Sequence, residues 1–213
     1  MTRALPSLTR RSLDQAIHDL ASQDPLMSAL LSQFGLPPMW QREQSFGTLV
    51  HIVLEQKVSL ASARAVMQRV QELCPGMSPE SFLQVSEKAL REAGISERKV
   101  SYCRSIAAAL HDGELDLKRL HRCSDEQVLQ QLTAIRGIGP WTAGVYLLMA
   151  MRRPDAWASG DRALAVSLAE CEQMAQVPSY AALDARAGQW RPHRAAAARM
   201  LWHAYLSRRA KQG

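Results

Sequence analysis

The chain has 213 residues, of which 47% are hydrophobic and 22% are charged, and its formal net charge is +6. This composition is typical of a globular protein long enough for one large helical domain or two small ones that share a core. No apolar run reaches the roughly 18 residues of a membrane span, and the basic N-terminus lacks the apolar segment of a signal peptide. The sequence thus argues against a membrane protein and favours a cytoplasmic one.

The positive charge favours a polyanionic partner, although mildly basic enzymes with no role on nucleic acid are also common. The four cysteines form no CxxC pair, so neither a zinc site nor an iron–sulfur cluster is expected. The six histidines form no HxH or HxxxH pair, and no cofactor is expected to be required.

Helical signals dominate the chain and strand-type alternation is nearly absent, so the predicted fold class is all-α, with about ten helices. Ser12, Ser45 and Ser59 each precede an apolar stripe at helical spacing, and each is expected to be the N-cap of one helix. Further helices are expected from Ser78, from Ser86 to Ala93, from Ser96 to Asp112, from Ser124 to about Ile135, from Pro140, from Asp161 and through the segment HRAAAARMLWHAYLSRR.

The segment LTAIRGIGPWTAG, residues 132–144, places a glycine-rich turn between two helices. Gly137 and Gly139 allow positive φ and the close approach of another backbone, and Pro140 suits the first position of the next helix. The first N–H groups of that helix would then point outward, an arrangement that suits a phosphate oxygen. For a lone GxG between helices, however, an ordinary αα-hairpin is the commoner explanation.

The complete string from Leu132 is more specific, because it resembles the helix-hairpin-helix element of DNA repair proteins. The resemblance implies that the hairpin holds a duplex phosphate without reading sequence. It also implies a monovalent cation, Na⁺ or K⁺, on the backbone carbonyls of Thr133, Ile135 and Ile138. The DNA-binding residues that it implies are Gln56, Lys57, Ser59, Arg136, Gly137, Ile138, Gly139 and Thr142.

Three other segments extend the resemblance over most of the chain: FGTLVHIVLEQKVSLASARA, LREAGISERKVSYCRSIAAALHDGEL and WRPHRAAAARMLW. Together with Asp161, which follows the hairpin at the start of the next helix, they resemble the helix-hairpin-helix DNA glycosylases. The most similar branch is that of 3-methyladenine DNA glycosylase II, which repairs alkylated bases. The resemblance implies two helical subdomains that flank a DNA-binding cleft, approximately residues 45–155 and residues 1–44 with 156–213.

Asp161 is the predicted catalytic residue. Cleavage of an N-glycosidic bond develops positive charge on the sugar, which a nearby carboxylate stabilises, and the same carboxylate can orient or deprotonate water. At a helix N-terminus, the helix dipole should keep this carboxylate ionised. An aspartate before RALAVSL would alone be interpreted as an N-cap, and the two roles are compatible.

Trp141 occupies the position where related glycosylases with a lyase step have a lysine, and no lysine lies between Lys118 and Lys211. A monofunctional enzyme is therefore expected, with water as the nucleophile and an abasic site as the product. An indole can stack on a flipped cationic base, so Trp141 is expected in the base pocket, with Trp40 and Trp157 as weaker candidates. The alternative for Trp141 is a core residue.

Lys57 departs from the family pattern. Relatives commonly have an apolar or amide residue at this position, which fills the gap left by a flipped base. A lysine can reach a phosphate or a base edge but is a poor wedge, and a solvated surface lysine is an equal alternative.

The expected partner is double-stranded DNA containing a damaged base, bound by a monomer. Two alternatives remain open from the sequence: a non-catalytic helix-hairpin-helix DNA-binding protein, and a glycosylase for deaminated or oxidised bases.

Overall fold

The computed structural model describes residues 7–210, and these residues form thirteen α-helices and no strand. The all-α fold class is confirmed. Residues 1–6 and 211–213, which the expected subdomains include, lie outside the described part of the chain. No helix within 7–210 is long and apolar enough to cross a membrane.

The chain divides into two compact units. Within the described residues, unit 1 comprises residues 42–146, and unit 2 comprises residues 7–41 together with 147–210. One boundary falls inside the helix Pro140–Met149, so these limits differ from the approximate subdomains expected from the sequence. The predicted subdomain boundaries stay a prediction.

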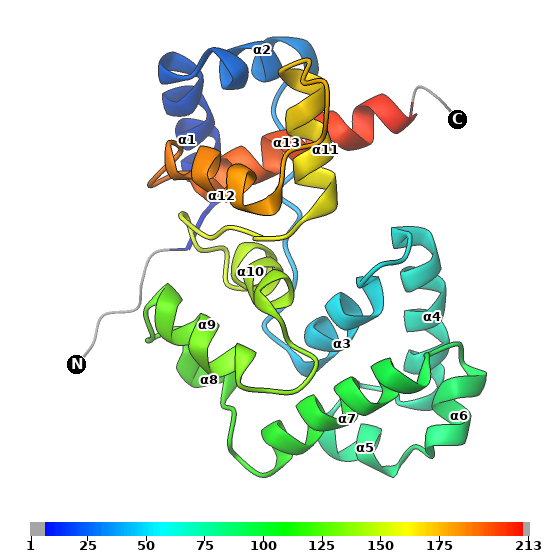
Figure 1. The fold of residues 1–213 in the computed structure, drawn as a ribbon. Helices are drawn as coiled ribbons and strands as arrows, with labels where there is room; N and C mark the ends of the chain where they lie inside the picture. Colours follow the sequence, from blue (N-terminus) through cyan, green and yellow to red (C-terminus); the bar gives the residue numbers. More distant parts are fainter. Residues whose placement is uncertain (1–6, 211–213) are drawn as a thin grey trace. The chain divides into compact units, whose positions relative to one another are not determined.

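Unit 1 is built around a long helix, α7, which packs against α3, α5 and α6 (Figure 1). Its core includes the edge-to-face pair Phe46 and Phe82, whose ring centroids are 5.3 Å apart. The helices of this unit are α3 (Phe46–Glu55), α4 (Leu60–Leu73), α5 (Pro79–Gln84), α6 (Glu87–Glu92), α7 (Glu97–His111), α8 (Leu117–Leu120), α9 (Asp125–Thr133) and most of α10 (Pro140–Met149).

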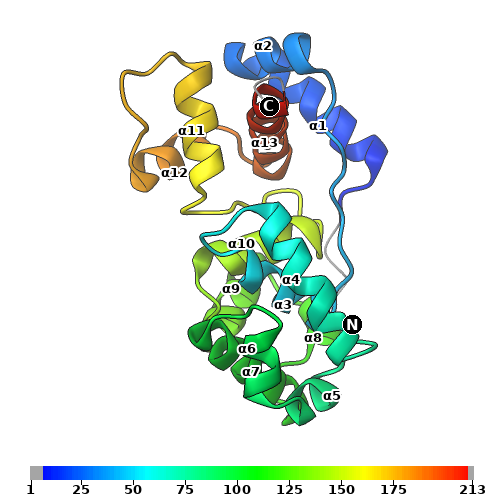
Figure 2. The ribbon, with the colours of Figure 1, turned by 90° about the vertical axis from the view of Figure 1, so that its right-hand side faces the viewer.

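Unit 2 is built around its last helix, α13, which packs against α1, α2, α11 and α12 (Figure 2). A row of alanines, residues 195–198, is buried along α13 and allows this close approach. Arg199 is also fully buried there and donates to the carbonyls of Met39, Leu148 and Ala195. The other helices are α1 (Arg10–Gln23), α2 (Pro25–Phe34), α11 (Arg162–Cys171) and α12 (Tyr180–Gly188).

Most of the predicted helix starts are confirmed. The side chains of Ser45, Ser59 and Ser124 each accept a hydrogen bond from a backbone N–H in the first helical turn, as expected of N-caps. The prediction for Ser12 is wrong. Thr9 caps α1: its side chain accepts a hydrogen bond from the Ser12 backbone N–H. The Ser12 hydroxyl in turn accepts one from the Thr9 backbone N–H, which completes a capping box.

The structure contains three helices that the sequence analysis did not predict: α2, α8 and α12. Asp24 caps α2 and Pro25 occupies its first position, so that signal was present. The helix α8 has only four residues, which is too short for a periodic apolar pattern.

Candidate functional site

The predicted hairpin lies between α9 and α10, in unit 1. The helix α9 ends at Thr133, the Ile138 N–H donates to the Ile135 carbonyl at 3.1 Å, and α10 begins at Pro140. The Ile138 side chain is buried, which anchors the hairpin to unit 1. Arg136 at the tip is exposed. The element therefore has the form predicted from its sequence.

The two hairpin glycines have different roles. Gly137 has a φ of +96°, and a β-carbon placed there would lie 2.3 Å from the β-carbon of Tyr102 on α7. Gly139 lacks a positive φ, and a β-carbon placed there would meet nothing within 4 Å. Of the two glycines that allow a positive φ, Gly137 adopts one and Gly139 does not. The close approach at Gly137 is made by an aromatic side chain.

The α3–α4 turn, residues 56–59, carries the predicted Lys57. Gln56 is the C-cap of α3, and Lys57, the next residue, has a φ of +59°. This left-handed position after a helix is usually occupied by glycine, because a β-carbon is disfavoured there. Lys57 is exposed, as are its neighbours Val58 and Leu60. Ser59 uses its hydroxyl to cap α4.

The α3–α4 turn and the hairpin are directly hydrogen-bonded to each other. The Gln56 Nε2 donates to the Gly137 carbonyl at 3.1 Å and to the Thr142 Oγ1 at 3.0 Å. The Thr142 side chain is buried, so its predicted contact with DNA would depend on the backbone N–H. Contacts of Gln56 and Thr142 with DNA stay predictions, and the structure shows what these side chains do within unit 1.

Lys99 on α7 holds the same turn, and the sequence analysis assigned it no role. Its ammonium donates to the carbonyls of Leu54, at 2.7 Å, and Gln56, at 2.9 Å. Burial lowers the pKa of Lys99 from its ordinary value, and the nearby positive charge of Arg98 lowers it further. In the sequence, Lys99 is visible only as the last residue of the segment LREAGISERK, which contributes to the family resemblance.

Asp161 lies in unit 2 and is the N-cap of α11. Its Oδ1 accepts hydrogen bonds from the Leu164 backbone N–H, at 2.9 Å, and from the Trp202 indole N–H, at 3.3 Å. The residue is 7% exposed. The N-cap role considered from the sequence is thus present, and two donors fix the orientation of the carboxylate. Its catalytic role stays a prediction at this point.

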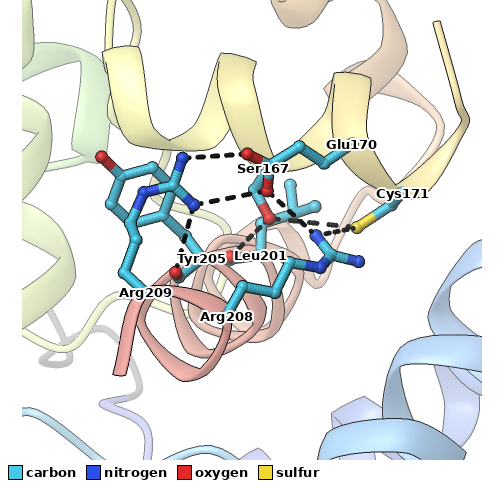
Figure 3. Close-up of polar contacts among 7 residues, drawn as sticks. All are labelled: Ser167, Glu170, Cys171, Leu201, Tyr205, Arg208 and Arg209. Atoms are coloured by element: carbon cyan, nitrogen blue, oxygen red, sulfur yellow. Dashed lines mark hydrogen bonds and ion pairs between the residues drawn. The ribbon is translucent and has the colours of Figure 1, made fainter. Parts of the chain in front are cut away.

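The helix α13 holds α11 along its length, which fixes the position of Asp161 within unit 2. At one end Trp202 donates to Asp161, and in the middle the Ser167 hydroxyl donates to the Leu201 carbonyl at 2.7 Å. At the other end Glu170 is paired with Arg208 and Arg209 (Figure 3). These ion pairs lower the pKa of the Glu170 carboxyl through hydrogen bonding to Arg209, although partial burial opposes the shift.

Of the three predicted pocket tryptophans, one belongs to unit 1 and two belong to unit 2. Trp141 is half-buried in unit 1, at the start of α10. Trp157, in unit 2, donates its indole N–H to Asp184 and packs against the ring of Trp190. Trp40, also in unit 2, lies edge-on to the ring of His203. Trp157 is buried within unit 2 and Trp40 is half-buried there, and a shared base pocket stays a prediction.

Within residues 7–210, no three histidine, cysteine, aspartate or glutamate side chains gather as metal ligands would. The cysteines described there are free thiols, and burial raises the pKa of Cys103 to about 12. Of the carbonyls predicted to bind a cation, that of Ile135 already accepts one hydrogen bond, which leaves a second lone pair. The cation site stays a prediction.

The hairpin, followed in sequence by an aspartate that caps the next helix, defines the class of protein. Residues 50–192 match the HhH-GPD superfamily of base excision DNA repair proteins, which is most of the chain. The chain therefore belongs to this superfamily.

Relatives within the superfamily point to one branch. The chain is 25% identical over 166 residues to DNA-3-methyladenine glycosylase 1 of Schizosaccharomyces pombe, which is 76% of the chain and 73% of the relative. It is 31% identical over 133 residues to the DNA-3-methyladenine glycosylase of Saccharomyces cerevisiae, 58% of the chain and 45% of the relative. The chain spans between 45% and 73% of the length of the first curated relatives that it matches.

Solved structures agree with this assignment. The S. pombe 3-methyladenine DNA glycosylase in complex with abasic DNA matches with a TM-score of 0.83 and 25% identity, over 88% of the chain and 95% of that structure. A DNA-3-methyladenine glycosidase from Bacillus halodurans matches with a TM-score of 0.73 and 29% identity, over 95% and 92%. The resemblance recognised in the sequence is confirmed.

Proposed function

We propose that this protein is a monofunctional DNA glycosylase that flips alkylated bases out of duplex DNA and hydrolyses their N-glycosidic bond, leaving an abasic site. Its substrates are cationic methylated purines. The family and the names of the relatives support this proposal. The observation on which it chiefly rests is Asp161, a carboxylate held at a helix N-terminus by two hydrogen-bond donors.

Asp161 is suited to stabilise the charge that develops on the sugar. As the bond to the base breaks, C1′ gains positive charge, and a fixed carboxylate favours that state over the neutral ground state. Because the Leu164 N–H and the Trp202 indole N–H both donate to Oδ1, the carboxylate needs little reorganisation when the charge appears. The same group can orient water or take its proton.

Water is the nucleophile in this proposal, because Trp141 stands where a lyase would have its lysine. A methylated purine that carries a positive charge leaves as a neutral base, so the enzyme needs no strong acid. The indole of Trp141 favours such a base through stacking and cation–π attraction, which is worth about 0.5–2 kcal/mol.

In this proposal the protein is a monomer, and its hairpin holds the duplex. Phosphate is bound at the N-terminus of α10 and by the exposed Arg136 and Lys57. A monovalent cation on the carbonyls of Thr133, Ile135 and Ile138 would strengthen the site electrostatically. Duplex affinity should then rise when K⁺ replaces a large organic cation at constant ionic strength. Equal affinity in both salts would argue against the cation.

The decisive test compares the wild type with Asp161→Asn on methylated duplex DNA. Asparagine is as good an N-cap as aspartate, so α11 and duplex binding should be retained. Release of methylated purines should fall by about 100- to 1,000-fold, since one preorganised charge at the reacting centre is lost.

Both proteins should first be shown to bind the duplex equally. The release of free bases is then measured by chromatography. If both proteins bind and neither releases a methylated base, the alkylation assignment fails. Duplexes with deaminated or oxidised bases would then separate a different glycosylase from a non-catalytic DNA-binding protein.

A further inference from the structure

Two segments of unit 1 carry most of the predicted DNA contacts: the α3–α4 turn and the hairpin. They are far apart in sequence, and each is short and exposed at its tip. Three contacts join them: one connects the turn to α7, one connects α7 to the hairpin, and one connects the turn to the hairpin. We call the set formed by Gln56, Lys99, Tyr102, Gly137 and Thr142 the clasp.

Lys99 connects α7 to the α3–α4 turn. The last carbonyls of a helix have no partner within it, and Lys99 bonds two such carbonyls at the end of α3, those of Leu54 and Gln56. No carboxylate pairs with the ammonium among the described residues. A partly buried ammonium is costly to desolvate, and a cation at a helix C-terminus recovers part of that cost from the dipole.

Tyr102 connects α7 to the hairpin. It lies three positions after Lys99, so both side chains are on one face of α7. The Tyr102 side chain occupies the space where a β-carbon at position 137 would lie, so it touches the hairpin backbone directly. One helical face therefore supports both segments.

Gln56 closes the set. Its side-chain amide donates at once to the Gly137 carbonyl and to the Thr142 hydroxyl, and so joins the turn to the hairpin and to α10. The next residue is Lys57, whose backbone is held in the left-handed region. The direction in which Lys57 leaves the turn is thus set relative to the hairpin.

We infer that Lys99 and Gln56 are positioning residues for base flipping. They fix Lys57 relative to the phosphate-binding hairpin, so that Lys57 meets the base pair at a fixed position relative to the phosphate that the hairpin holds. The inference rests on the proposed glycosylase function. Neither residue needs to touch the reacting atoms.

The test uses Lys99→Met and Gln56→Leu, with Lys99→Arg as the conservative variant and Lys88→Met as the matched control. Lys88 is in the same unit, its side chain is 81% exposed, and its ammonium forms an exposed surface pair with Glu92 at 3.9 Å. Single-turnover excision is measured on two duplexes, with one 7-methylguanine either paired with cytosine or opposite an abasic site. The second lesion is already unpaired and needs less flipping.

We expect Lys99→Met and Gln56→Leu to slow excision of the paired lesion by about tenfold to a hundredfold, and that of the unpaired lesion much less. Lys99→Arg should recover part of the loss, because a guanidinium can also donate to two carbonyls. Equal losses on both duplexes, or no loss relative to Lys88→Met, would overturn the inference.

A second measurement separates this inference from the proposed function. Hydrogen exchange should become faster in residues 56–59 and 136–142 together in Lys99→Met, and stay unchanged in Lys88→Met. If the wild type excises no methylated base, the glycosylase proposal fails, and this exchange result alone decides whether the clasp exists. Unchanged exchange in both segments would overturn it.

Discussion

At the scale of single residues, the backbone of Lys57, one of several non-glycine residues with a positive φ, departs from what stability alone would favour. A left-handed residue other than glycine costs roughly 1–2 kcal/mol relative to ordinary backbone. The position follows α3 directly, where glycine would end the helix without strain. Lysine at this position therefore makes the folded state less stable than glycine would.

We predict that Lys57→Gly makes the protein slightly more stable and less active. The gain should be at most about 1 kcal/mol, because the greater freedom of glycine in the unfolded chain offsets part of the relieved strain. Urea unfolding and duplex excision, measured on the same preparation, test both effects. Lys57→Ala, which keeps the strain, should lose excision without gaining stability. Full activity in both variants would show that Lys57 is only a solvated surface residue.

At the scale of elements, the hairpin is held by shape as well as by hydrogen bonds. The contact between Gly137 and Tyr102 leaves no room for a methyl group, and the neighbouring atoms belong to the rigid base of the side chain. The equivalent space at Gly139 is open.

We predict that Gly137→Ala destabilises unit 1 by about 2–4 kcal/mol and weakens duplex binding, because the new β-carbon requires both an unfavourable φ and a displaced α7. Gly139→Ala is the control and should change either quantity little. Thermal unfolding and fluorescence anisotropy with an undamaged duplex measure the two effects. Similar losses in both variants would mean that the GxG pattern matters as a flexible turn.

The sequence was sufficient to predict what depends on neighbouring residues. N-caps such as Ser45 and Ser124 act within a single turn, and the hairpin of α9 and α10 has a specific local pattern. Asp24 followed by Pro25 is the same kind of local signal and marks the start of α2.

The remaining features of the site could not be predicted from local patterns. The hydrogen bonds of Gln56 and Lys99 join residues between 43 and 86 positions apart. The left-handed backbone of Lys57 contradicts the glycine preference on which such predictions depend. Only the folded arrangement of α3, α7 and the hairpin makes these roles visible.

At the scale of the whole molecule, each compact unit has its own core and its own titrating groups. His51 in unit 1 lies beside Glu55, which is paired with Arg42. Burial lowers the pKa of His51 below its ordinary value of 6.5; Glu55 opposes this shift, and Arg42 and Arg64 add to it. The folded protein therefore binds the His51 proton less readily than the unfolded chain.

We predict that the stability of unit 1 decreases as the pH falls below 6.5, because the unfolded chain then takes up a proton that folded His51 resists. Thermal unfolding at pH 7.5, 6.5 and 5.5 should show a smaller decrease in His51→Gln than in the wild type. A parallel decrease in both proteins would assign the pH dependence to other groups.

The division of the chain has a consequence for protein synthesis. The helices α1 and α2 are made before α13, against which they pack. Among the described residues, unit 1 is built from one continuous stretch, residues 42–146. While unit 1 folds on the ribosome, α1 and α2 can pack against each other, but their surfaces that contact α13 stay exposed to chaperones and to neighbouring chains. Chains stalled near residue 190, where residues 42–146 have left the ribosome and α13 is not yet made, should thus resist protease within 42–146 and be cut within 7–41.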